Sequence, residues 1–325
     1  MKKFVIILSV ISLLLLTYTL YQINRKQSVS VEINIEKGMH TTDIAFLLEK
    51  EGVISDPYIF ILMVKLRNST LKAGYYSFKG DLSIFDVLNM LEKGYVKEYL
   101  FTIIPGDNLI TIAEKLQNEG IVEKEKFLRF VFDKNNVKAK NLEGDSFEGY
   151  FPPETYRIPY KSDLNGVINI FLKEFEKKYL PYKDKFKDKS ITLYEGMIIA
   201  SMVEKEAFLK EEKPIIAGVI FNRLKKGMRL QIDATVIYGL MLKNRYSGKL
   251  RKDDMKFDSP YNTYIYKGLP PTPICSFSLS SLDAVINPKA HNYLYYVLSK
   301  DRKSHIFTDN YDDHLKNIEL NLKSK

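Results

Sequence analysis

The 325-residue sequence contains no tryptophan, one cysteine and four histidines. A single cysteine, Cys275, excludes an intramolecular disulfide framework and a cysteine-rich metal site. The histidines are scattered, at His40, His291, His305 and His314. They lack the compact spacing of metal ligands, so we expect no metal and no other cofactor. Without tryptophan, any platform that stacks on sugar rings must use the 22 tyrosines and 19 phenylalanines.

Several motifs of common enzymes are also missing from the sequence. It contains no G-x-S-x-G nucleophile elbow, no Walker A loop and no dinucleotide fingerprint. The net charge of +9 suits an anionic partner, but the lysines are spread along the chain. No basic run is interleaved with aromatic residues, so nucleic acid is not an expected partner. The length indicates more than one domain.

The N-terminus holds a long apolar run. Residues 4–23 carry no charged side chain, and 20 helical residues at about 1.5 Å each span the roughly 30 Å hydrocarbon core of a bilayer. Tyr18 and Tyr21 lie where interfacial aromatic residues belong. The alternative is a cleaved signal peptide, whose apolar core is shorter and ends at an A-x-A-like site that this segment lacks. We therefore predict that residues 1–26 are a retained anchor in the cell membrane. Basic residues flank both ends, so the charge rule leaves the orientation open.

An internal repeat follows the apolar run. Residues 33–54 and 101–122 match at an offset of 68 positions. The matched pairs are Gly38 with Gly106, Ile44 with Ile112, Ala45 with Ala113, Leu48 with Leu116, Glu51 with Glu119, Gly52 with Gly120, and Val53 with Ile121. Each copy predicts a short strand, a glycine turn and an amphipathic helix that ends at glycine. We expect a compact LysM-like α+β module over residues 27–135, which either binds glycan or serves as a spacer.

Two glutamates, Glu204 and Glu206, lie one residue apart at the end of a predicted helix. Thr192 and Glu195 form a capping box that marks the start of this helix. At 3.6 residues per turn the two glutamates point about 160° apart. Glu206 falls on the apolar stripe, where desolvation should raise its carboxyl pKa to a value useful for a general acid. We expect Glu206 to be catalytic and Glu204 to be dispensable for catalysis, whereas the alternative for either residue is an ordinary solvated helix end.

Polar residues are dense downstream of this helix, amid apolar neighbours. The candidate substrate-binding residues are Asn222, Arg223, Gln231, Asp233, Tyr261 and Asn262. Planar amide and guanidinium groups suit sugar hydroxyls and amides, and rings suit pyranose faces. Arg223 and Asp233 could equally form a buried ion pair. Neither Glu204 nor Glu195 pairs convincingly with Glu206, so the carboxylate pair of an ordinary glycosidase is not evident.

Five further stretches complete the pattern: "ASMVEKEA", "FNRLKKGMRLQIDATVIYG", "SPYNTYIYKGLPPTPI", "NPKAHNYLYYVL" and "HIFTDNYDDH". Together with "FEGYFPPETY" they resemble the motifs of the MltG (YceG-like) family of endolytic peptidoglycan transglycosylases. Ile232 and Ala234 depart from the usual Thr and Pro. The resemblance implies an α+β protein with a single transmembrane helix, a small LysM-like module and a mixed α/β catalytic domain over residues 136–325. Its matching motif assigns catalysis to Glu206.

The resemblance also implies a reaction and its partners. Glu206 would cleave the MurNAc–GlcNAc β-1,4 bond of nascent peptidoglycan and leave a 1,6-anhydro-MurNAc end, without consuming water. This cut would end the elongation of the strand. The expected partners are glycan strands and the penicillin-binding peptidoglycan synthases. The N-terminus would be cytoplasmic and the catalytic domain extracytoplasmic. Two alternatives remain open: a hydrolytic muramidase on the same scaffold, and a non-catalytic membrane-anchored glycan-binding scaffold protein.

Overall fold

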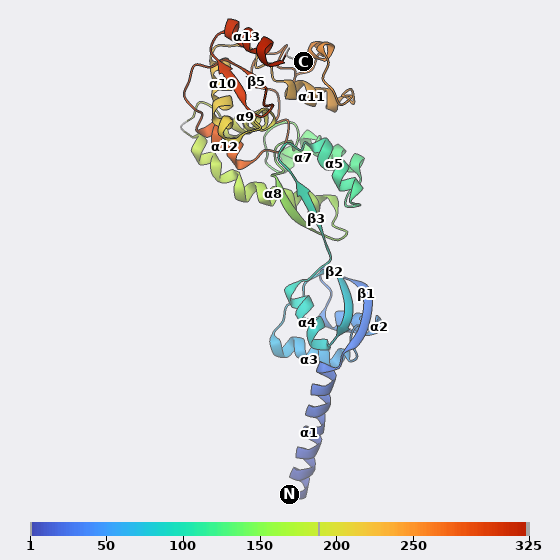
Figure 1. The fold of residues 1–325 in the computed structure, drawn as a ribbon. Helices are drawn as coiled ribbons and strands as arrows, with labels where there is room; N and C mark the ends of the chain where they lie inside the picture. Colours follow the sequence, from blue (N-terminus) through green and yellow to red (C-terminus); the bar gives the residue numbers. More distant parts are fainter. Residues whose placement is uncertain (1, 188, 323–325) are drawn as a thin grey trace. The chain divides into compact units, whose positions relative to one another are not determined.

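The computed structural model describes residues 2–187 and 189–322, and its ribbon is shown in Figure 1. The helices are α1 (Lys2–Asn24), α2 (Thr41–Lys50), α3 (Pro57–Arg67), α4 (Ile84–Lys93), α5 (Leu109–Asn118), α6 (Lys124–Val131), α7 (Lys134–Ala139), α8 (Leu164–Lys178), α9 (Leu193–Glu206), α10 (Lys213–Lys225), α11 (Asp233–Leu242), α12 (Leu279–Ile286) and α13 (Tyr311–Leu322). The strands are β1 (Gln27–Ile35), β2 (Gly74–Leu82), β3 (Glu98–Ile103), β4 (Glu154–Pro159), β5 (Tyr295–Leu298) and β6 (His305–Thr308). The expected mixed α+β class is confirmed.

The chain forms two compact units. Unit 1 comprises Met1–Tyr99 and Arg157–Ser162, and unit 2 comprises Leu100–Tyr156 and Asp163–Lys325. The predicted boundary at residue 135 differs from this division, because residues 100–135 pack with the C-terminal part. Ser276 N donates to Asp107 O at 2.6 Å, and Gly106 N donates to Ser276 O at 2.8 Å. The second copy of the repeat therefore belongs to unit 2.

Unit 1 is built on the antiparallel pair β1–β2, whose register runs from Gln27 opposite Leu82 to Ile35 opposite Gly74. Side chains alternate along β1, and Val29, Ile33 and Ile35 face a core shared with α2, α3 and α4. The order is strand, two helices, strand, then α4. The likeness of this unit to LysM modules, and its binding of glycan, stay predictions.

The two copies of the repeat adopt the same local structure. Gly38 and Gly106 have φ angles of 93° and 92° in the turn before the helix, and Gly52 and Gly120 have φ angles of 71° and 68° after it. The helices between them, α2 and α5, are ten residues long each. Because positive φ strains any residue that has a Cβ, both turns favour glycine. The predicted order of strand, glycine turn and helix is confirmed in both copies, although the copies lie in different units.

One helix in the described residues, Lys3–Asn24 within α1, is long and apolar enough to cross a membrane, with a mean hydropathy of 2.3. A signal sequence would share these properties. The C-terminal end of α1 packs on the rest of unit 1: Ile23 contacts the core, and Ser55 Oγ donates to Gln22 Oε1 at 3.1 Å. The apolar helix is thus compatible with a single-pass anchor.

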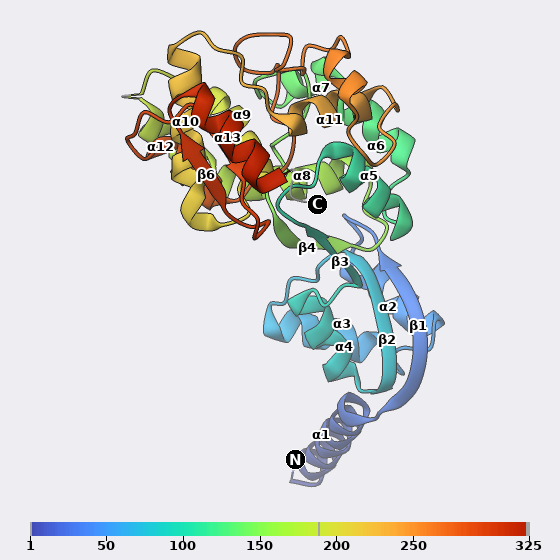
Figure 2. The ribbon, with the colours of Figure 1, turned by 45° about the horizontal axis from the view of Figure 1, so that its top comes forward.

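Unit 2 is organised around α9. The predicted capping box at its start is confirmed, because Thr192 N donates to Glu195 Oε2 at 2.7 Å and Glu195 N donates to Thr192 Oγ1 at 3.2 Å. Every residue from Gly196 to Val203 is buried, since α10, α11 and α12 pack around the helix. The sequence predicted one apolar stripe, and the structure buries the helix on all sides. Figure 2 shows α13 lying against β6, which pairs with β5 at the C-terminal end of the unit.

A buried carboxyl group ties the second repeat to α11. Glu148 Oε2 accepts from Leu109 N at 3.1 Å, at the start of α5, and from Tyr238 Oη at 2.8 Å, in α11. Burial raises the pKa of Glu148 to about 7, although these hydrogen bonds oppose the rise. This contact connects the repeat to the helix that begins with Asp233.

Candidate active site

Glu206 is the last residue of α9 and emerges from the core of unit 2 into a pocket of about 420 Å³. The lining includes Glu206, Arg223, Gln231 and Asp233, together with four tyrosines and two histidines. Tyr296 Oη, from β5, donates to Glu206 Oε2 at 2.8 Å. The pocket volume falls within the range of sites for small molecules, about 300–1,000 Å³. The Glu206 carboxyl group thus lies among aromatic rings and planar polar groups, with Asp233 as the second carboxyl group of the pocket.

The surroundings of Glu206 disfavour its charged form. Burial raises the pKa of the Glu206 carboxyl above its ordinary value, and the negative charge of Asp233 raises it further. The hydrogen bond from Tyr296 and the nearby His305 act in the opposite direction without reversing the shift. A raised pKa keeps more of the carboxyl protonated near neutral pH, which is the state that a general acid requires.

Glu204 leaves α9 on another face, as the helical phase predicted. Lys213 Nζ lies 3.1 Å from both carboxylate oxygens of Glu204, and both side chains are about nine-tenths buried. Ser278 Oγ and Ser281 Oγ donate to Glu204 Oε2 at 2.6 Å each. Burial alone would raise the pKa of Glu204, but the serine hydrogen bonds and the charge of Lys213 outweigh it, so this pKa lies below its ordinary value. Glu204 is therefore a buried anion joining α9, α10 and α12.

Three of the six predicted substrate residues, Arg223, Gln231 and Asp233, line the same pocket as Glu206. Asp233 begins α11, and Tyr264 Oη donates to its Oδ1 at 2.6 Å. Gln231 has a φ of 54°, and its Oε1 accepts from Arg223 Nη1 at 3.2 Å. A left-handed conformation at glutamine is uncommon and marks a backbone held by its surroundings.

The Arg223 guanidinium holds backbone rather than a carboxylate. Its Nε donates to Leu294 O at 2.6 Å, and its Nη1 donates to Leu230 O at 2.8 Å. The guanidinium carbon also lies 5.1 Å from the centre of the Tyr295 ring. The alternative of a buried ion pair between Arg223 and Asp233 is wrong, because Asp233 instead accepts a hydrogen bond from Tyr264. Arg223 connects α10 to the segment before α11 and to the residue before β5.

Asn222, Tyr261 and Asn262 are not among the residues that line the pocket. Asn222 Nδ2 donates to two backbone carbonyl oxygens before β5 at 2.9 and 3.0 Å. Asn262 is completely buried, and its Nδ2 donates to two carbonyl oxygens of the preceding loop at 3.0 and 2.8 Å. The hydroxyl groups of Tyr261 and Thr272 are 2.9 Å apart. These polar groups stabilise loops around the site, so their placement differs from the expected contact with substrate.

The residues that the β5–β6 hairpin and α13 bring to the pocket were not predicted as site residues from the sequence. They are Tyr295, Tyr296, His305, Tyr311 and His314, and Tyr264 joins them from the loop after α11. Two of the quoted motifs, "NPKAHNYLYYVL" and "HIFTDNYDDH", contain five of the six. The motifs were thus the available signal, but nothing in the sequence showed that they face Glu206.

His305 is held in one orientation by a second carboxylate. Its Nδ1–H donates to Glu212 Oε2 at 2.7 Å, and its backbone N donates to Glu212 Oε1 at 2.7 Å. Their side chains are only 8% and 10% exposed. The Tyr296 ring packs edge-on against the imidazole, with 5.4 Å between centroids. Because Nδ1 is engaged, Nε2 is the ring nitrogen left for a bound molecule.

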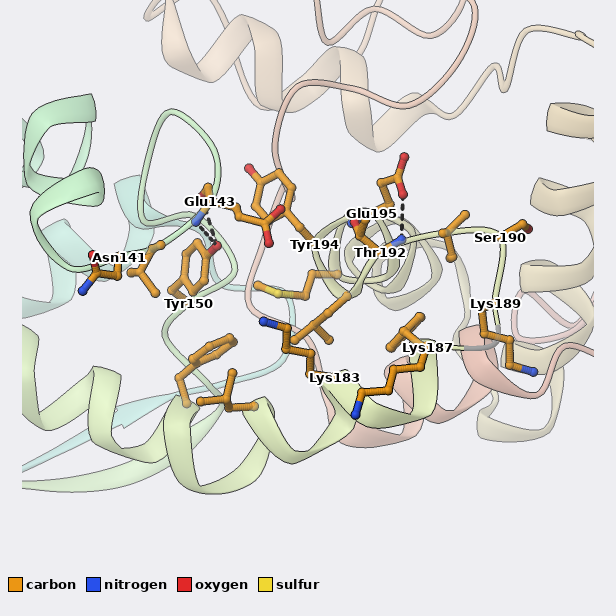
Figure 3. Close-up of a pocket in the computed structure, with 17 residues that line it drawn as sticks. Asn141, Glu143, Tyr150, Lys183, Lys187, Lys189, Ser190, Thr192, Tyr194 and Glu195 are labelled. Carbon is orange, nitrogen blue, oxygen red and sulfur yellow. Dashed lines mark hydrogen bonds between the residues drawn. The ribbon is translucent and has the colours of Figure 1, made fainter.

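A larger hollow of about 550 Å³ lies at the opposite end of α9 (Figure 3). Tyr150, Tyr194 and Lys183 line it, and Glu195 in it is bonded to the backbone of Thr192. The 14 residues of α9, at about 1.5 Å each, place this hollow roughly 20 Å from Glu206. The smaller pocket contains the Glu206 carboxyl group, whose pKa is raised, beside several polar groups.

Comparison with known proteins identifies the family. A model of the YceG-like family matches residues 33–320. The chain belongs to the YceG-like family. A crystal structure of a yceG-like protein from Listeria monocytogenes has a TM-score of 0.60 and 28% identity to this chain, and the match covers 89% of this chain and 99% of that one. The match to the family model extends over both units, from within β1 to within α13.

Curated relatives of the chain carry the name endolytic murein transglycosylase. The protein of Streptococcus pneumoniae serotype 2 is 32% identical over 336 residues, which cover 94% of this chain and 61% of the relative. The protein of Bacillus subtilis is 30% identical over 324 residues, which cover 93% of this chain and 88% of the relative. This YceG-like chain thus spans about three fifths of the length of the pneumococcal relative and most of the length of the Bacillus one.

Proposed function

We propose that this YceG-like chain is an endolytic murein transglycosylase with Glu206 as its catalytic residue. The observation that carries the proposal is a single carboxyl group with a raised pKa, placed in a pocket of rings and polar groups at the motif that matches the family. The names of the two relatives described above support the same reaction. A non-catalytic scaffold protein would have no need of a desolvated carboxyl group in a pocket.

The proposed reaction uses one carboxyl group twice. Protonated Glu206 donates its proton to the glycosidic oxygen between MurNAc and GlcNAc, and the bond from C1 to that oxygen breaks. The resulting Glu206 carboxylate then accepts the proton of the MurNAc C6 hydroxyl as O6 bonds to C1. The products are a free GlcNAc hydroxyl and a 1,6-anhydro-MurNAc end, with Glu206 protonated again. No water is consumed, so no second carboxylate is required to activate one.

The other pocket residues are proposed to bind the glycan. Gln231 and Asp233 present an amide and a carboxylate for sugar hydroxyl groups and acetamides. The Nε2 atom of His305 is the ring nitrogen that can hydrogen-bond to the glycan, because Glu212 engages Nδ1. Tyr295 and Tyr311 supply ring faces in place of the missing tryptophan. Arg223 is a positioning residue that holds the backbone of this wall.

Product analysis tests the proposal. The purified full-length chain is incubated with peptidoglycan, and the released muropeptides are analysed by mass spectrometry. We expect 1,6-anhydro-MurNAc ends from internal cuts, 18 mass units below the corresponding reducing ends because one water is absent. Reducing MurNAc ends alone would contradict the lytic reaction.

A hydrolytic muramidase is the second candidate, and one observation favours it. Asp233 lies near enough to Glu206 to raise the pKa of its carboxyl, so the pocket holds two carboxyl groups. Glycosidases that hydrolyse their substrate use such a pair, one as acid and one as base or nucleophile. The hydroxyl of Tyr264 donates to Asp233 Oδ1 at 2.6 Å, so one oxygen of Asp233 is already engaged. The product masses separate the two candidates.

We expect opposite shifts of the pH profile from two neighbours of Glu206. The quantity kcat/KM should fall as pH rises through the pKa of Glu206, because the free enzyme must start protonated. Asp233→Asn removes a negative charge, lowers the Glu206 pKa and moves this alkaline limb to lower pH. Tyr296→Phe removes a hydrogen bond to the carboxylate, raises the pKa and moves the limb to higher pH. Kinetics on soluble glycan fragments measure both limbs, and shifts of the two variants in the same direction would refute the assignment.

The location and partners belong to the same proposal. We infer that α1 anchors the chain in the cell membrane, with its N-terminus in the cytoplasm and unit 2 outside, where peptidoglycan lies. The proposed substrates are nascent glycan strands, whose elongation the cut would end. Proximity to the penicillin-binding synthases is proposed from the family resemblance. The LysM-like unit 1 is proposed to act as a spacer or a glycan grip beside the membrane.

A further inference from the structure

Helix α3 of unit 1 is apolar on two faces. Ile59, Phe60 and Val64 point into the core, as a packed helix requires. Another face carries Tyr58, Leu62 and Leu66, which are 71%, 45% and 77% exposed. The spacing of four residues places these three side chains along one side of the helix. We call Tyr58, Leu62 and Leu66 the α3 stripe.

The α3 stripe is extended by an aromatic residue from another helix. Phe46 of α2 is 44% exposed, and its ring packs edge-on against Tyr58 with 5.8 Å between centroids. A continuous exposed apolar patch of this kind marks an interaction surface in soluble domains. In the described part of the chain, no other segment covers these side chains.

Helix α3 lies beside the end of α1, as the ribbon shows (Figure 1). Ser55, just before the N-cap Asp56 of α3, donates to Gln22 in the last turns of α1 at 3.1 Å. Tyr18 and Tyr21 on α1 are exposed at the same end of that helix, where interfacial aromatic residues belong. The first residue of the stripe is thus three positions from a residue that contacts the end of the apolar helix.

We propose that the α3 stripe lies in the headgroup boundary of the bilayer that α1 crosses, so that unit 1 is held by a span and an interfacial helix. The inference rests on the proposed role of α1 as an anchor. Interfacial helices bury their apolar face about 5–10 Å into the boundary between headgroups and acyl chains. Lys65 is exposed on the same helix, and its long side chain can reach lipid phosphates.

A lipid surface fits this patch better than a protein partner does. The Ser55–Gln22 contact puts the start of α3 next to the last turns of α1, which is where lipid headgroups lie if α1 spans the membrane. A partner protein would have to displace those lipids. Burying the stripe in lipid would restrict tilting of unit 1 at the membrane, and would set the height of its β1–β2 pair above the membrane.

The absence of tryptophan allows a direct test with single-tryptophan reporters. The full-length chain carrying Tyr58→Trp or Leu66→Trp is reconstituted in vesicles of phosphatidylcholine and phosphatidylglycerol, with or without bromine on the acyl chains. We expect both reporters to emit at shorter wavelength than in water and to be quenched by brominated lipid. Both positions are exposed, so circular dichroism should show an unchanged fold.

Tyr95→Trp is the matched control in the same unit. Tyr95 is 59% exposed and precedes Val96, whose side chain contacts Gly74 at the end of β2 opposite Ile35. The eight steps from Gln27 to Ile35, at about 3.3 Å each, place Tyr95 roughly 25 Å from the α1 end of the strand pair. Its emission should stay like that in water and unquenched.

A fourth reporter, Tyr21→Trp, separates failure of the inference from failure of the anchor. Quenching at Tyr21→Trp without quenching at Leu66→Trp would overturn the inference and leave the anchor intact. No quenching at Tyr21→Trp would overturn both. Emission from Leu66→Trp at short wavelength that brominated lipid does not quench would identify a protein contact, and would overturn the lipid as occupant.

Discussion

Glu206→Gln should abolish peptidoglycan cleavage while leaving the fold at least as stable as before. Glutamine keeps the shape of the side chain, and its amide oxygen can still accept from Tyr296 Oη, but it cannot deliver a proton. Loss of a general acid or base typically costs about 10²–10⁴-fold in rate. Because Glu206 is proposed to serve in both proton transfers, we expect the upper end of that range, measured as muropeptide release per enzyme.

The thermal stability of Glu206→Gln provides an independent test of the raised Glu206 pKa. The folded-state pKa of Glu206 is raised, so the unfolded chain ionises first as pH increases. The native state therefore loses stability between the unfolded value of about 4.3 and the folded pKa. Glu206→Gln removes this loss and should melt at the same or a higher temperature at neutral pH. A variant that is both inactive and less stable would point to a structural role.

Glu211→Gln is the matched control, since it makes the same chemical change at an exposed position five residues further along. It should retain wild-type activity and melting temperature. If Glu206→Gln retains most of the wild-type rate, the catalytic assignment is wrong, whatever products the wild type makes.

Local chemistry made part of the structure predictable. The capping box joins Thr192 and Glu195, which are three positions apart, and it is confirmed. The glycine turns of the repeat also depend on nearby residues, and they are confirmed too. The phase of a helix also follows from spacing alone, so the divergence of Glu204 and Glu206 could be anticipated. What each side chain meets on its own face could not, because their partners come from α10, α12 and β5.

Long-range pairing explains what the sequence left open. Tyr296 donates to Glu206 across 90 positions, and His305 reaches Glu212 across 93. Asn262 was expected to contact substrate because amides suit sugars, but the same amide satisfies buried backbone carbonyl groups equally well. Composition alone cannot separate these uses. Likewise, the similarity of the two repeats did not reveal that one of them packs with the C-terminal unit.

Breaking the buried pair of Glu204 and Lys213 should destabilise unit 2 strongly without changing the chemistry. Lys213→Met leaves the Glu204 carboxylate buried with only hydroxyl and backbone donors, and removing one partner of such a pair costs about 3–5 kcal/mol. A domain of 150–250 residues loses roughly 2–4 °C per kcal/mol, so the melting temperature should fall by about 10 °C. Lys225→Met, an exposed change on the same helix, should leave it unchanged.

The pH dependence and a double variant show whether the pair itself is responsible. The folded pKa of Glu204 is lowered, so its contribution is present above the unfolded value of about 4.3 and is lost as pH falls through the folded pKa. The melting temperatures of wild type and Lys213→Met should therefore converge on acidification.

Glu204→Gln combined with Lys213→Met should be less destabilised than the sum of the single changes, because neither charge is then left unpaired. Each variant should cut glycan at a rate near wild type well below its melting temperature, since neither side chain lines the Glu206 pocket. A loss of activity in fully folded Glu204→Gln would contradict the separation of the two glutamates into a structural anion and a catalytic acid.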